Sequence, residues 1–189
     1  PPSRVLAGPR AQLAPLRDTP AYRRASAACH GLVHGPLLGA VTPATARFWV
    51  RTELETAVEV RLSRTGNFAA PDARGTAESR AQDDYTAVVA VDGLSPRTEY
   101  RYQLYLGGRP VPREQEWRFV TSPGDQHAGK LRLAFGGCAQ YEPVNERIWD
   151  TIRLRRPEAF LLLGDNVYVD LPQAIGPFHR YTYYQRQSR

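Results

Sequence analysis

Lysine is almost absent from this chain of 189 residues, in which Lys130 is the only one. The net charge of +6 therefore comes from arginine, and the arginines are spread along the sequence without forming a stripe. Because a basic stripe is the usual mark of a nucleic-acid surface, we expect no nucleic acid as a stable partner. No apolar run approaches the roughly 18 residues of a membrane span. We therefore expect no membrane span.

Other absences narrow the chemistry. The sequence contains no G-x-x-x-x-G-K-[ST] loop, which argues against hydrolysis of nucleotide triphosphates. It has two cysteines, Cys29 and Cys138, and their contexts argue against a disulfide between them. Cys29 lies in a polar stretch, whereas Cys138 follows an apolar run in a Gly-Gly turn that suits a reactive or metal-binding thiolate. The start at Pro1, without a signal-peptide core, indicates a processed chain or an excised piece and no particular compartment.

Most of the chain has the period of β-strands. Alternation of apolar and polar residues is clear over residues 58–62 and 100–104, and turn signals such as Gly66-Asn67 and Gly107-Gly108 separate the strands. Short strands at this spacing predict a β-sandwich, so the fold class is mainly β. The expected strands are 46–51, 57–63, 85–91, 99–106 and 116–121.

The segment 92–102 sharpens this prediction. It resembles the corner before the sixth strand of fibronectin type III domains, in which a tyrosine hydroxyl, here that of Tyr100, ties the corner to nearby backbone. Trp49 is the candidate core tryptophan, and the resemblance covers about residues 32–122. Tyr100 and Trp49 as ordinary core aromatics would fit the same fold.

Composition divides the chain into four regions. Residues 1–31 are rich in Pro, Ala and Arg and are expected to form an arm. The sandwich follows over 32–122, then a polar linker over 123–129. From 130 to 189 the period changes to strand, helix, strand.

Two apolar runs, 131–135 and 159–163, predict buried parallel strands, and the segment 144–154 between them predicts a helix. Such a βαβ crossover brings Cys138 and Asp165 to the same edge of the sheet. Neighbouring strands lie about 4.8 Å apart, near enough for a thiolate and a carboxylate to reach one ion. Tyr168, three residues past Asp165, can turn back to the same point.

Each of these side chains has a structural alternative. Asp165 would be desolvated at the strand end unless a cation satisfied it, although it could instead cap a helix. Tyr168 could be a packed aromatic, yet beside Asp165 it favours ferric iron, because only a highly charged ion stabilises a phenolate near neutral pH. Cys138 could be a buried thiol or a nucleophile, but no histidine stands in a local motif with it.

Taken together, the sandwich region and the strand-helix-strand region resemble the alkaline phosphatase D (PhoD-like) family, relatives of the purple acid phosphatases within the calcineurin-like metallophosphoesterases. Residues 35–51 are similar to the opening strands of its fibronectin-like domain. Phe135-Gly136-Gly137-Cys138 is similar to its first metal motif, and Gly164-Asp165-Asn166-Val167-Tyr168 matches the shared G-D-x-x-Y motif, the most specific of the three.

The resemblance implies hydrolysis of phosphate mono- or diesters by metal-activated water. It implies that Cys138, Asp165 and Tyr168 bind Fe3+, that a second divalent ion, often Ca2+, shares Asp165, and that the protein is secreted or periplasmic. The later motifs of the family are missing. We therefore expect a partial metallophosphatase domain over 130–189, inactive alone, whose partner is the remaining part of the catalytic domain. The alternative is a fibronectin-like binding module with a non-catalytic remnant.

Overall fold

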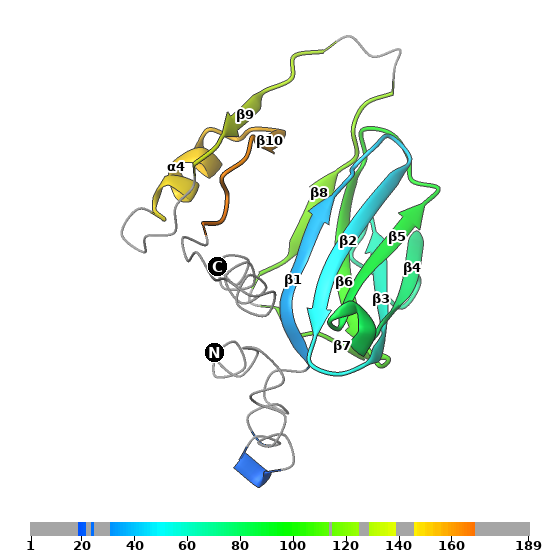
Figure 1. Cartoon of the computed structure of the whole chain (residues 1–189). Helices are drawn as coiled ribbons and strands as arrows, with labels where there is room; N and C mark the ends of the chain where they lie inside the picture. The colour runs from blue at the N-terminus through cyan, green and yellow to red at the C-terminus, as the bar shows by residue number, and fades with distance from the viewer. Residues whose placement is uncertain are drawn as a thin grey trace. The chain divides into compact units, whose positions relative to one another are not determined.

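The computed structural model describes residues 31–113, 115–124, 129–138 and 146–168, together with residues 19–21 and 24. The chain divides into two compact units, residues 1–127 and 128–189 (Figure 1). The division falls within the polar segment 123–129. Among the described residues, no helix has the length and apolar character needed to cross a membrane.

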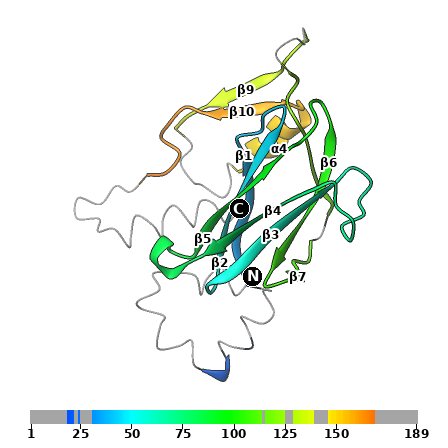
Figure 2. The same ribbon diagram turned by 90° about the vertical axis from the view of Figure 1, so that its right-hand side faces the viewer.

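The first unit is a sandwich of two antiparallel sheets (Figure 2). One sheet has the order β1-β2-β5, and the other has the order β4-β3-β6-β7 with β8 also paired to β6. The strands are β1 (Leu32–Gly39), β2 (Thr45–Thr52), β3 (Thr56–Ser63), β4 (Ala73–Ser79), β5 (Thr86–Asp92), β6 (Glu99–Leu106), β7 (Arg109–Pro110) and β8 (Trp117–Val120). The predicted sandwich is thereby confirmed.

Aromatic side chains pack against one another within the mainly aliphatic core between the two sheets. The ring of Tyr102 lies 5.0 Å from Phe48 and 5.5 Å from Trp117, measured between ring centroids. The prediction that Trp49 is the core tryptophan was wrong, because the alternation of β2 directs Phe48 and Val50 inward and leaves Trp49 half-buried on the outer face. Trp117 takes that place, packed against the edge of the core.

The tyrosine corner is present. The Ser95 amide donates a hydrogen bond of 3.1 Å to the Tyr100 hydroxyl, five residues further along the chain. Thr121 reinforces the corner, since its hydroxyl donates to the Ser95 carbonyl at 2.6 Å and accepts from the Thr98 amide at 2.9 Å. The resemblance of this segment to a fibronectin corner is therefore confirmed in its hydrogen bonding.

The second unit contains β9 (Leu133–Gly136), α4 (Ile148–Leu154) and β10 (Ala159–Leu162). The two strands are parallel neighbours, with Leu133 opposite Ala159 and Gly136 opposite Leu162, as predicted. The predicted helix began at 144, but residues 139–145 lie outside the described residues.

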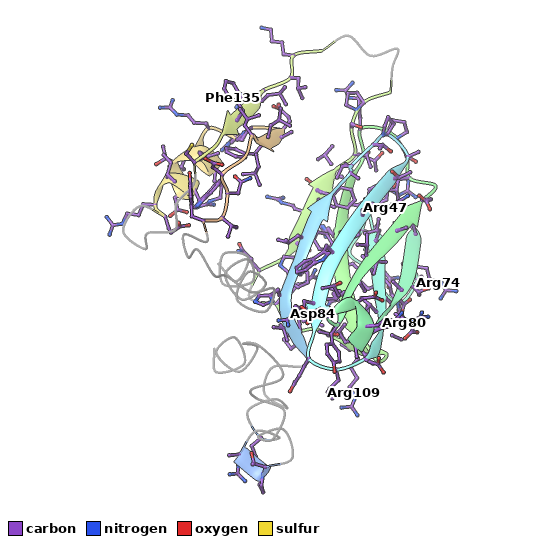
Figure 3. All side chains as sticks on the ribbon, viewed as in Figure 1. Arg47, Arg74, Arg80, Asp84, Arg109 and Phe135 are labelled. Atoms are coloured by element: carbon purple, nitrogen blue, oxygen red, sulfur yellow. The ribbon has the colours of Figure 1, made fainter. Side chains whose placement is uncertain are left out.

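The prediction that these strands are buried was wrong. Phe135 is 70% exposed (Figure 3), and Leu161, which lies opposite it on β10, is 49% exposed. The helix packs Trp149 against Phe160, with ring centroids 5.4 Å apart, on one face of the sheet. No described element of this unit covers the other face, so the apolar residues there remain in contact with solvent.

The sandwich generates a prediction at Gly75, where β4 crosses β5. A Cβ there would lie 2.0 Å from the Ala90 carbonyl oxygen, a backbone atom that cannot rotate away. Gly75→Ala should therefore lower the free energy of unfolding by about 3 kcal/mol, measured by denaturant unfolding followed by circular dichroism. Gly39→Ala is the matched control, because a Cβ at Gly39 meets nothing within 4 Å. Equal midpoints for the two variants would refute this packing.

A second prediction concerns pH. Burial raises the pKa of Tyr102 to about 12, whereas the unfolded phenol ionises near 10. Between these values unfolding releases a proton, so the free energy of unfolding should fall by about 1.4 kcal/mol per pH unit as pH rises. Tyr102→Phe should remove that part of the slope. The prediction fails if unfolding at a series of alkaline pH values gives the parent and the variant the same slope.

Candidate metal centre

Two backbone hydrogen bonds continue the strand pairing into the loops that follow β9 and β10. The Leu163 amide donates to the Gly136 carbonyl at 2.8 Å, and the Cys138 amide donates to the Gly164 carbonyl at 3.2 Å. The carboxyl ends of the two strands are thus held together beyond their last paired residues. Cys138 and Asp165 are brought to one edge of the sheet, as the sequence predicted.

Three side chains meet at one carboxylate oxygen. The Cys138 thiol lies 3.7 Å from Asp165 Oδ2, and the Tyr168 hydroxyl donates to the same oxygen at 3.2 Å. Cys138 and Asp165 are exposed, while Tyr168 is half-buried. The expectation that Asp165 is desolvated was therefore wrong, because the loop places its carboxylate at the surface.

The backbone is strained where it carries these groups. Cys138 has a φ of 55° and Asp165 a φ of 52°, both in the left-handed region that side chains with a Cβ adopt at a cost of roughly 1–2 kcal/mol. Gly137 permits the close approach of the two loops, since a Cβ there would lie 3.1 Å from the Gly164 carbonyl oxygen. Strained residues persist where the surrounding structure fixes them, which is common at functional sites.

The electrostatics keep the phenol neutral. The hydrogen bond with Cys138, then desolvation and the negative Asp165 raise the pKa of Tyr168 well above its ordinary value. Without a cation, ionising the phenol would place a phenolate against a carboxylate. A positive ion between the three groups would reverse this preference and allow the thiolate, carboxylate and phenolate to coexist.

The arrangement fits a metal ion. Two donor atoms bound ~2.0–2.3 Å from one ion and at right angles lie about 3 Å apart. The 3.2 Å between Tyr168 and Asp165 Oδ2 has this value, and the 3.7 Å between Cys138 and the same oxygen corresponds to a wider angle at the ion. Among the described residues, no three or more histidine, cysteine, aspartate and glutamate side chains gather at a site that could hold a metal. Cys138 and Asp165 become a set of three donors only when the Tyr168 phenol is included.

The alternatives for these residues can now be compared with the structure. None of the described residues 165–168 is helical, so the Asp165 carboxylate does not cap a helix that begins there. The described part of the second unit holds no histidine to activate Cys138 as a nucleophile. The metal-binding role of Cys138, Asp165 and Tyr168 stays a prediction, for which their convergence supplies the geometry.

Asn166 was missed by the sequence reasoning. Its side-chain oxygen is enclosed by the protein and has no hydrogen-bond donor among the described residues. The only signal in the sequence was an amide directly after the aspartate of the motif, and that position is variable in the pattern G-D-x-x-Y.

Residues 29–123 match a family model described as a domain of unknown function, DUF7800. The matched residues are 95 of 189, half of the chain. The chain belongs to this family. The comparison with curated proteins found no match.

Solved structures add information about the fold. The "Structure of PhoD" matches with a TM-score of 0.69 and 18% identity, over 85% of this chain and 35% of that chain. This shows a PhoD-like fold, and the chain spans about a third of the length of that structure. A fibronectin type III domain from the human KIAA0970 protein matches with a TM-score of 0.36 and 12% identity, over 56% of this chain and 82% of that one.

Proposed function

We propose that this chain is part of a metal-dependent, PhoD-like phosphoesterase that hydrolyses phosphate mono- or diesters. The observation that carries the proposal is the convergence of the Cys138 thiol and the Tyr168 phenol on Asp165 Oδ2. The PhoD-like fold is consistent with it, and within this chain the parallel pairing of β9 with β10 brings Cys138 and Asp165 to one edge of the sheet.

In this proposal Cys138, Asp165 and Tyr168 hold Fe3+, and Asp165 also faces a second divalent ion, Ca2+ or another. The bound ions supply a water activated for attack on phosphorus. Tyr168 would release its proton to solvent when the ion binds, because a cation there would outweigh the groups that raise its pKa. Cys138 contributes a thiolate and fixes the carboxylate beside it, and the left-handed backbone at both residues holds their side chains in place.

The rest of the catalytic domain is the proposed partner. The apolar residues exposed on β9 and β10 support this, because a parallel sheet is stable when both of its faces are covered. Further ligands for the second ion would come from that part. A secreted or periplasmic location remains the expectation from the family resemblance.

A binding module is the second candidate function. The first unit has a complete core of its own and ties its corner with Tyr100, so it does not depend on the second unit for its packing. In that case the sandwich would present a surface to a partner, and the second unit would be a remnant without metal. The metal experiments below separate the two candidates.

The chain loaded with Fe3+ should show a visible charge-transfer band from phenolate to iron. Tyr168→Phe should abolish the band, because the variant has no phenolate to place on the ion. Tyr105→Phe on β6 is the matched control and should leave the band unchanged. Absorption spectra together with iron analysis test this, and a colourless parent protein that binds no iron would exclude the proposed site.

The chain by itself should hydrolyse a generic aryl phosphate only marginally with Fe3+ and Ca2+ present, because further ligands of the second ion would come from the rest of the catalytic domain. In a longer protein that includes the rest of the catalytic domain, Asp165→Asn should lower kcat/KM at least about 100-fold. Asp92→Asn, which removes an exposed ion pair with Arg47 in the sandwich, is the control. Parental turnover in Asp165→Asn would contradict the assignment.

A further inference from the structure

The Asn166 side-chain oxygen is a buried acceptor without a donor among the described residues. It has essentially no solvent-accessible surface, and no described residue donates a hydrogen bond to it. Asn166 as a whole is half-buried, so this oxygen is the enclosed part of a side chain that lies at the surface. Buried polar atoms without a partner are rare in native proteins, and they often mark a position where an ion or an ordered water binds.

The position of Asn166 connects this oxygen with the candidate metal centre. It directly follows Asp165, whose φ of 52° turns the chain sharply, and it precedes Tyr168 by two residues. Side-chain amide oxygens of this kind are common ligands of calcium and similar hard divalent ions. They add no negative charge, which suits an ion whose other ligand is already an anionic carboxylate.

The contacts of Asp165 indicate which ion Asn166 serves. The Cys138 thiol and the Tyr168 hydroxyl both contact Oδ2. The other carboxylate oxygen, Oδ1, makes no hydrogen bond with a described residue and is left for a second ion. Iron held by Cys138, Asp165 and Tyr168 would already have three anionic donors, so a neutral oxygen is better placed on the divalent side.

We propose that Asn166 is a further ligand of the divalent ion that Asp165 shares, donating its side-chain oxygen to that ion. The proposal rests on the proposed function, because it needs the divalent ion. It accounts for the enclosed oxygen, which no described residue satisfies and which the ion would satisfy. It also gives Asn166 a role in the selectivity of the second site for hard cations, which prefer oxygen ligands.

Calcium titration of a longer protein that includes the rest of the catalytic domain, loaded with Fe3+ and followed by calorimetry, tests this. Asn166→Leu keeps the approximate size of the side chain and removes the oxygen, so calcium affinity should fall at least about tenfold. Asn166→Asp keeps an oxygen and adds charge, so affinity should be retained or increased. Asn67→Leu, in a surface turn of the sandwich, is the matched control and should bind calcium as the parent does.

Two more measurements make the result decisive. The visible iron band should persist in both Asn166 variants, because Asn166 is not on the iron. The metal-free Asn166→Leu protein should be no less resistant to denaturant than the parent, because an unsatisfied buried acceptor has been removed. If Asn166 instead had a structural role, Asn166→Leu would be less stable than the parent in the absence of metal.

Calcium affinity within twofold of the parent in Asn166→Leu would overturn the proposal. The proposal would also be overturned if metal-free Asn166→Leu were less stable than the parent and both Asn166→Leu and Asn166→Asp bound calcium more weakly, because those results indicate a structural role. Should Asn166→Leu fail to fold, Asn166→Asp decides, and weaker calcium binding there refutes the ligand role. A parent chain that binds iron but shows no Asn166 effect refutes only this inference, whereas one that binds no iron refutes the proposed function.

Discussion

The parallel pairing of β9 with β10 is the constraint on which the candidate site depends. The pairing continues past the strands through the Leu163 amide to Gly136 and the Cys138 amide to Gly164. Because parallel strands end at the same edge, residues 27 positions apart in the sequence are brought within contact of each other. A break in this pairing would separate the thiol from the carboxylate even with every side chain intact.

The same site is unfavourable without a cation, in ways that support its assignment. Two residues adopt left-handed backbone, a phenol is held neutral against a carboxylate, and the Asn166 oxygen lacks a donor among the described residues. Each feature carries a free-energy cost, and a bound ion would compensate the electrostatic ones together. The core of the sandwich differs, since its apolar side chains alternate inward and its corner hydrogen bonds are made.

Sequence reasoning succeeded where a local pattern determines the structure. The Gly-terminated apolar runs located Cys138 and Asp165 at one sheet edge, and the segment around Tyr100 predicted its corner. It failed where tertiary context decides. β4 was missed because Ala73–Ser79 has little strand propensity and forms by pairing with β3. Trp49 was placed on the wrong face because the sequence of a strand does not show which of its two faces another sheet covers. The apolar residues of β9 and β10 are exposed because covering them requires further elements, which the local sequence pattern does not predict.

X-ray absorption at the iron edge of the Fe3+-loaded chain tests the central claim most directly, because it identifies the atoms bound to the metal. The account predicts one sulfur from Cys138 among ligands that are otherwise oxygen, and loss of that sulfur in Cys138→Ala. An iron surrounded only by oxygen or nitrogen, with a spectrum unchanged in Cys138→Ala, would contradict it.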